Sequence, residues 1–308
     1  MSTVIRRAAV SRTGSRPGIR AGGRPGSRAG GRPGRLSKRA RSVLGTCTGI
    51  VIVAVMLFPL YWMLDASFLR PQDLVSLTPT WFPLHGTLAG YRSVLSSQGG
   101  HLLVSLVVSL GTVAVTLVIA APAAYGMAKL RAPGRRVLLF ALLVAQMIPG
   151  IVLANSFYVI ANSLGLINSP VALILADSTL AVPFATLILH SFLRGVPDEL
   201  SEAAAIDGAS RLRTFVSVIL PVARNAVITA GLFSFLFAWA DFLFAVTLTT
   251  QDNHAPITVG IYRFIGANVT QWNSVMAAGV IASIPAALLL IIAQRYVAVG
   301  IGSAATKD

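Results

Sequence analysis

Two groups of polar residues in this sequence have types and spacings that could bind a ligand or a partner. The first is the pair Trp239 and Asp241, in an otherwise apolar segment. An indole ring can stack on a sugar ring and a carboxylate can accept hydrogen bonds from its hydroxyls, so the pair suits a polar cyclic solute. Asp177 is a candidate of the same kind, because ionisable groups in apolar spans are costly and usually face a wet cavity. Further polar contacts are expected from Gln146, Asn155 and Tyr158. The alternative for each is a hydrogen bond to a neighbouring helix or to a partner subunit.

The second group lies in the polar segment 194–224, "RGVPDELSEAAAIDGASRLRTFVSVILPVAR". Pro197 followed by two acids predicts a helix start, because proline suits the first turn and acids complement the positive end of the helix dipole. Gly208 can adopt the positive-φ conformation that ends such a helix. One face of this helix carries Leu200, Ala203, Ala204 and Asp207, with Glu202 beside it.

A second short helix is predicted directly after the first. Ser210 is placed to cap it, and Leu220-Pro221 is expected to halt it. Its apolar side chains are Leu212, Phe215, Val216 and Ile219. The small residues of the first helix suit docking in a groove of a partner protein. They suit equally well an interfacial helix that lies against its own bundle.

The elements that position these residues are membrane spans. Hydrophobic residues make up 55% of the 308 residues and charged residues 11%, which excludes an ordinary soluble globule. Six windows are long enough, at about 20 residues each, to cross a bilayer as helices. They are 43–64, 102–124, 137–160, 170–193, 225–248 and 273–294. The predicted fold is therefore all-α and polytopic.

Basic residues set the orientation, because positive charge near the ends of spans stays on the cytoplasmic side. Segments 1–41, 129–136, 194–224 and 295–308 hold 22 of the 25 Lys and Arg residues. Six spans with both termini in the cytoplasm satisfy this distribution. The chain then divides into a disordered basic tail, 1–42, and a six-span membrane domain, 43–308.

The tail accounts for most of the net charge of +15, since residues 1–41 carry 12 positive charges and no negative ones. Its Gly and Pro content predicts disorder, and its arginines are expected to rest on anionic lipid headgroups. An RNA-binding arm is the alternative, although segment 1–41 offers no aromatic residue on which a base could stack.

The sequence shows no motif for ATP binding, metal binding or an internal disulfide. None of Lys38, Lys129 and Lys307 stands in a GxxxxGK[ST] context, so no ATP-binding P-loop is predicted. The four His residues show no metal-binding spacing, and the single Cys47 cannot form a disulfide within the chain. We therefore expect no catalytic residues, no metal and no cofactor on this chain.

The segment 194–224 resembles the EAA loop of permease subunits in bacterial ATP-binding cassette importers. The shared elements are EAA at 202–204, Gly208 and VILP at 218–221, and "VPDELSEAAAIDGAS" is similar to the carbohydrate-uptake branch. The resemblance continues in "AAYGMAKLRAPGRR" at 123–136 and in "AWADFLFA" at 238–245, where the family string reads WNEFLFA. In that family the loop forms a coupling helix that seats in a cleft of the ATPase. The coupling residues that this implies are Glu202, Ala203, Ala204, Asp207, Gly208, Leu220 and Pro221.

The resemblance implies a permease subunit in a bacterial cytoplasmic membrane that takes up a sugar or oligosaccharide. Its implied partners are a second permease, an ATPase dimer that binds ATP and Mg²⁺, and an external substrate-binding protein. A permease for a non-sugar solute such as glycerol phosphate is an alternative. An ATP-independent carrier or channel is another, and it predicts that mutations in the coupling loop have no effect.

Overall fold

The computed structural model describes residues 38–130, 133–267 and 271–305, and the predicted tail lies outside them except for residues 38–42, which begin a helix. The chain divides into two compact units, Met1–Ala54 and Val55–Asp308. The boundary between them falls inside the first helix, whereas the sequence-based boundary is at residue 42. The second unit contains all the candidate site residues.

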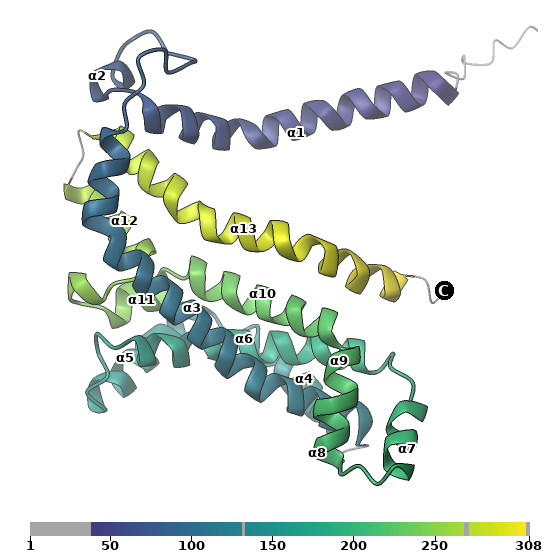
Figure 1. Cartoon of the computed structure of the whole chain (residues 1–308). Helices are drawn as coiled ribbons and strands as arrows, with labels where there is room; N and C mark the ends of the chain where they lie inside the picture. Colours follow the sequence, from purple (N-terminus) through teal and green to yellow (C-terminus); the bar gives the residue numbers. More distant parts are fainter. Residues whose placement is uncertain (1–37, 131–132, 268–270, 306–308) are drawn as a thin grey trace, which may run out of the picture. The chain divides into compact units, whose positions relative to one another are not determined.

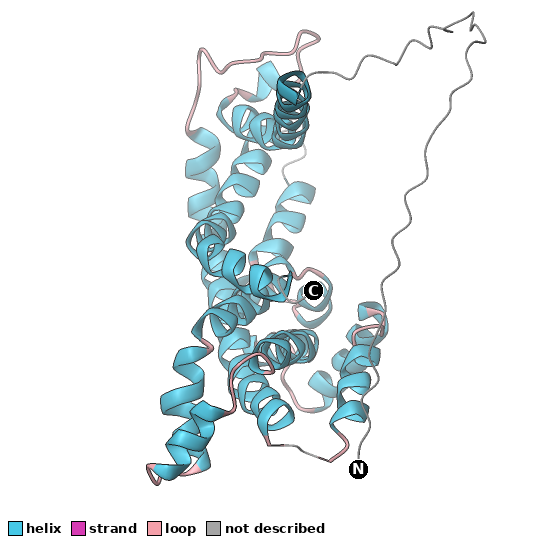
Figure 2. Cartoon of the chain, turned by 90° about the vertical axis from the view of Figure 1, so that its right-hand side faces the viewer, coloured by secondary structure: helices cyan, strands magenta, loops and turns pink. Residues whose placement is uncertain are grey.

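The described part of the chain is helical and contains no strand (Figures 1 and 2). In chain order the helices are α1 (Lys38–Phe68), α2 (Pro71–Leu74), α3 (Ala89–Lys129), α4 (Arg135–Ala145), α5 (Gly150–Ser163), α6 (Pro170–Leu193), α7 (Glu199–Ile206), α8 (Arg211–Thr214), the π-helical turn η1 (Phe215–Ile219), α9 (Leu220–Val222), α10 (Arg224–Ala240), α11 (Leu243–Leu248), the 3₁₀ turn η2 (Asp252–His254), α12 (Ile257–Ala267) and α13 (Trp272–Ala305).

Four of the predicted spans are confirmed as unbroken helices. Segments Gly45–Phe68, Ala89–Lys129, Pro170–Leu193 and Trp272–Gln294 are long and apolar enough to cross a membrane. Two further helix pairs are strongly bent, Arg135–Ala145 with Gly150–Ser163 and Arg211–Val222 with Arg224–Ala240. If each pair also counts as one span, the described residues hold up to six. The all-α class and a multi-pass membrane protein are thus confirmed.

The sequence predicts one straight helix over the window 137–160, and this prediction is wrong. It is split into α4 and α5, which meet at an angle of 93°. Pro149 stands immediately before α5 with φ −61° and ψ 130°, and a proline disfavours helical geometry in the residue before it. The window is apolar, as predicted, but its helix is not continuous.

The window 225–248 is also interrupted, at Asp241. This residue ends α10 in an extended conformation, with φ −64° and ψ 130°. Its carboxylate accepts hydrogen bonds from the backbone N–H groups of Phe244, at 3.3 Å, and Ala245, at 2.9 Å. Asp241 therefore starts α11 in the manner of a helix cap, and a straight span across it is wrong.

Small residues set the close packing of the central helices. Ala120 on α3, Ala185 on α6 and Ala230 on α10 are completely buried. Gly231 faces Leu117 and Val113 of α3, at 3.5 and 3.6 Å from where a Cβ would stand. Such residues let helix backbones approach closely, which is how helices associate in a bilayer without a hydrophobic driving force.

Asn168 ties the turn between α5 and α6 to the end of α11. Its backbone has a φ of 64°, which is rare for a residue other than glycine. Its Oδ1 accepts hydrogen bonds from the backbone N–H groups of Thr250, at 2.7 Å, and Gln251, at 2.9 Å. The backbone N–H of Asn168 also donates to the carbonyl oxygen of Leu248 at 3.0 Å.

We expect Asn168→Ala to destabilise the protein by about 1–3 kcal/mol, because two backbone donors lose their acceptor and alanine does not favour a positive φ. Thermal unfolding of the detergent-purified protein measures this. Asn168→Gly removes the same acceptor but relieves the backbone, so its loss should be smaller than that of alanine. Equal unfolding temperatures for the alanine variant and the native protein would contradict this role of Asn168.

Candidate functional site

The first helix predicted in segment 194–224 is α7, and its ends are as expected. Glu199 and Glu202 stand in its first turn, where acids complement the helix dipole. Gly208 follows it with a φ of 76°, the positive-φ stop that the sequence predicts. Ser210 then caps the second helix, because its Oγ accepts a hydrogen bond from the backbone N–H of Arg213 at 3.3 Å.

The second helix ends at Val222, directly after the predicted stop at Leu220-Pro221, and the chain then bends by 81° into α10. Helical backbone runs from Arg211 to Val222 and ends at Ala223. The N–H of Leu220 bonds to the carbonyl oxygen of Phe215, five residues earlier, in a π-helical turn. The wider turn ahead of Pro221 accommodates a ring that would otherwise clash with the preceding turn.

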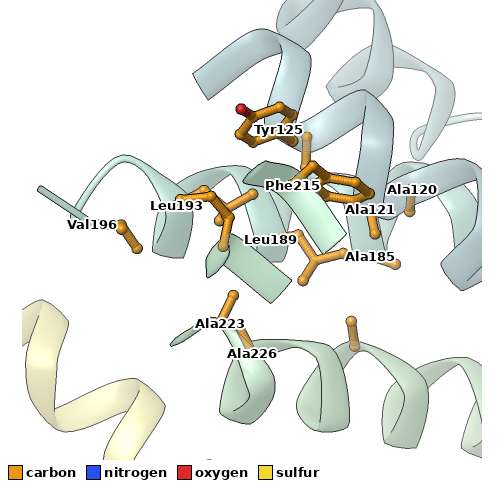
Figure 3. Close-up of a cluster of buried hydrophobic side chains, with 13 residues drawn as sticks. Ala120, Ala121, Tyr125, Ala185, Leu189, Leu193, Val196, Phe215, Ala223 and Ala226 are labelled. Carbon is orange, nitrogen blue, oxygen red and sulfur yellow. The ribbon is translucent and has the colours of Figure 1, made fainter. Parts of the chain in front are cut away.

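A buried cluster joins this second helix to α3 and α6 (Figure 3). The rings of Tyr125, from α3, and Phe215 lie 4.9 Å apart. Leu189 and Leu193 from α6 belong to the same cluster, as does Ile219, which is completely buried. The segment that follows α7 is therefore fixed to two long helices.

By contrast, α7 is mostly exposed. Only Ala204 is buried, with 8% of its surface exposed, and α7 contacts the chain's own α8 and η1. The other predicted coupling residues on this helix and its stop, Glu202, Ala203, Asp207 and Gly208, are all exposed. Farther on, Pro221 is exposed and Leu220 is half-buried.

Two apolar side chains of this loop were not selected as site residues from the sequence. Ile206 is 87% exposed and Leu212 is 72% exposed. Apolar side chains that are exposed on a polar helix outside the lipid-facing spans are candidates for contact with a partner. The sequence signal was available for Ile206, because it stands between small and acidic residues at the end of a polar helix.

The candidate solute-path residues Trp239 and Asp241 already have partners within the chain. Trp239 is 6% exposed, its Nε1–H donates to the carbonyl oxygen of Ala282 at 3.0 Å, and its ring stacks on that of Phe235 at 5.4 Å. Asp241 caps α11, as described above. Asp177 on α6 is 3% exposed.

The other candidates lie on the broken span. Gln146 ends α4 and its Nε2 donates to the carbonyl oxygen of Leu180 on α6 at 3.1 Å. Asn155 and Tyr158 are exposed on α5. Between them in sequence, Phe157 packs edge-on against Phe244 of α11 at 5.6 Å. The structure thus places α5 beside the helix that Asp241 caps.

Beside Trp239 the structure has an open pocket of about 360 Å³. Its other walls come from α3 and α13 and include Leu102, Leu106, Ile281 and Pro285. These side chains offer no hydrogen-bond donors or acceptors, so the pocket does not suit sugar hydroxyls. Among the described residues, no group of three or more His, Cys, Asp or Glu side chains could hold a metal ion.

Comparison with known proteins identifies the class to which this loop and these spans belong. The profile of the family described as binding-protein-dependent transport system inner membrane component matches residues 117–302. The chain belongs to this family. It is a transmembrane permease of the ATP-binding cassette importer type, as the motifs in segments 123–136, 194–224 and 238–245 predicted.

Individual relatives agree with the family. The sulfoquinovosyl glycerol transport system permease protein SmoH of Agrobacterium fabrum is 34% identical over 82% of this chain and 89% of the relative. The trehalose transport system permease protein SugB of Mycobacterium tuberculosis is 32% identical over 83% of this chain and 94% of the relative. The diacetylchitobiose uptake system permease protein DasC of Streptomyces coelicolor is 29% identical over 84% of this chain and 95% of the relative.

The fold is also that of a solved transporter. A chain in the crystal structure of a bacterial importer of the acidic polysaccharide alginate matches with a TM-score of 0.74, covering 86% of this chain and 99% of that chain. Its sequence identity is 20%, so this likeness concerns the fold alone.

Proposed function

We propose that this chain is a permease subunit of a sugar or oligosaccharide importer and works with a second permease, an ATPase dimer and an external substrate-binding protein. Its relatives are named for carbohydrate-containing solutes of different size, which supports a carbohydrate rather than one particular sugar. We place ATP and Mg²⁺ on the ATPase and propose no catalytic role for this chain.

One observation carries the proposal: α7 exposes acidic, small and apolar side chains together. The second helix of the same loop is packed against α3 and α6, so α7 is the part of the loop that stays exposed. Ala204 is the buried residue of α7, which contacts α8 and η1, while Glu202, Ala203 and Ile206 are exposed. An interfacial helix pressed on its own bundle would bury its apolar side chains. The exposure of Ile206 therefore favours a partner, and we assign α7 as the helix that docks in the ATPase.

The orientation follows from this assignment. Positive charge near the ends of spans stays on the cytoplasmic side, so we propose that α7, both termini and the segments that hold 22 of the 25 basic residues are cytoplasmic. The basic segment 1–41 is then available to anionic lipid headgroups, and we assign no nucleic-acid partner to it.

For the solute path we propose the region around the break at Asp241. A broken span with a carboxylate at the break is a common way to build a polar site within a membrane. Asp177 and Asp241 supply carboxyl groups there, and the residues that we propose to complete the path are Trp239, Gln146, Asn155 and Tyr158. Trp239 and Asp241 would have to exchange their present partners for the solute.

Purification of the tagged chain from the cells that produce it tests the proposal. We expect an ATPase subunit, a second permease and a binding protein to be recovered with it after mild solubilisation and crosslinking. Mass spectrometry of the solute released from that binding protein should identify a sugar. Recovery of the chain with no ATPase, or release of a solute that is not a carbohydrate, would contradict the corresponding part of the proposal.

A further inference from the structure

The cytoplasmic end of α3 is attached to the segment that leads into α7. The Nζ of Lys129, in the last turn of α3, donates hydrogen bonds to the carbonyl oxygen of Val196 and to Oδ1 of Asp198, the latter at 2.6 Å. The side chain of Lys129 is 6% exposed, whereas that of Asp198 is 70% exposed. A largely buried ammonium group is costly unless it is paired, so Lys129 holds its partners in one position.

One helical turn earlier, α3 also contacts the segment that follows α7. Tyr125 packs its ring against Phe215 at 4.9 Å. Residues four apart lie on the same face of a helix, so Tyr125 and Lys129 present one surface of α3 to the loop. That surface contacts Val196 and Asp198, which precede α7, and Phe215, which follows it. The 41-residue α3 in turn packs along α6 and α10, the helices that carry Asp177 and lead to Asp241.

We propose that Lys129 is a positioning residue for energy coupling, which clamps the entrance of the α7 loop to α3 so that a displacement of α7 is transmitted to the spans. This inference rests on the proposed docking of α7 in the ATPase. Without the clamp, the Gly195–Pro197 connection could bend, and α7 could follow the ATPase while α3 stayed in place.

The test uses the assembled transporter in proteoliposomes, with the binding protein purified together with its own bound solute. Two rates are measured: ATP hydrolysis without the binding protein, and the increase in hydrolysis when the loaded binding protein is added. Lys129→Met should retain the ATPase subunit and its basal hydrolysis, but lose about tenfold or more of the stimulation and of solute uptake. Lys129→Arg keeps the charge and the donors, and should remain within a few-fold of the native protein.

Controls separate positioning from a general loss of stability. Arg136→Met removes an exposed positive charge from the same basic segment and should behave as the native protein. Asp198→Asn alters only the exposed partner, so it should fold even if Lys129→Met does not, and it should also reduce stimulation. The double change Lys129→Asp with Asp198→Lys should recover part of the stimulation.

Full stimulation in both Lys129→Met and Asp198→Asn would overturn the inference. Glu202→Ala, measured in parallel, separates this result from a failure of the proposed function. If Glu202→Ala loses uptake while the Lys129 and Asp198 variants keep stimulation, α7 docks as proposed but Lys129 does not position it. If all three variants transport normally, the docking of α7 is itself wrong.

Discussion

Gly208→Arg should reduce solute uptake tenfold or more, while leaving the protein inserted in the membrane. Gly208 has a φ of 76°, and a Cβ added there would meet no atom within 4 Å. The substitution therefore costs only about 1–2 kcal/mol of backbone strain and no clash within the chain. Its large charged side chain would, however, project from the end of α7 into the surface that we assign to the ATPase.

The measurement is uptake of labelled solute by intact cells, together with the amount of variant protein in the membrane fraction. Gly134→Arg is the matched control, because Gly134 also has a φ of 76° and open space around the added side chain. It precedes α4 and lies outside the coupling loop. Glu202→Ala removes an exposed carboxylate of α7 and should also lose uptake. Normal uptake in both Gly208→Arg and Glu202→Ala would contradict the coupling role of α7.

Ile206→Asp should detach the ATPase from the permease. Ile206 is 87% exposed, so the chain alone gains almost no stability from it. Burying an isoleucine side chain in a partner contributes about 1.5–3 kcal/mol, which corresponds to roughly 10–150-fold in affinity. An aspartate would lose this contribution and carry an uncompensated charge into an apolar contact.

Co-purification at graded salt and detergent concentrations measures how much ATPase the variant retains. Leu77→Asp is the comparison, because Leu77 is completely exposed in the outer loop before α3, on the other side of the membrane by our assignment. It should retain the ATPase fully. If Ile206→Asp retained as much ATPase as Leu77→Asp, Ile206 would not belong to the interface.

The sequence predicts the four continuous spans because each is a long stretch of apolar residues, and average hydropathy is enough to find such stretches. It does not predict the two breaks, because a window average conceals single residues. Pro149 and Asp241 each act locally, one by restricting the backbone before α5 and the other by capping α11 with its carboxylate.

The coupling loop was predictable in outline for a different reason. Its helix start, glycine stop and serine cap are local signals that depend on adjacent residues, and all three are confirmed at Glu199, Gly208 and Ser210. Side-chain direction depends on tertiary packing, so the burial of Ala204 could not be predicted, whereas the position of Ile206 among small and acidic residues was a usable signal. The π-helical turn that carries the second helix through Pro221 depends on the same packing around Phe215.

Contacts between distant segments also could not be predicted from the sequence. Lys129 and Asp198 are 69 residues apart, and Asn168 and Thr250 are 82 apart. Neither pair has a fixed spacing by which it could be recognised. For the same reason the partners of Trp239 and Asp241 within the chain were not anticipated, and their role in the solute path stays a prediction.

The central claim is that this chain carries solute only when a separate ATPase acts on α7. The most direct measurement is solute uptake by proteoliposomes that contain the purified permeases with the loaded binding protein, with and without the ATPase and enclosed ATP. We expect uptake only when ATPase and ATP are both present, and none when Gly208→Arg replaces the native chain. Uptake at the same rate in the absence of the ATPase would contradict this account and favour an ATP-independent carrier.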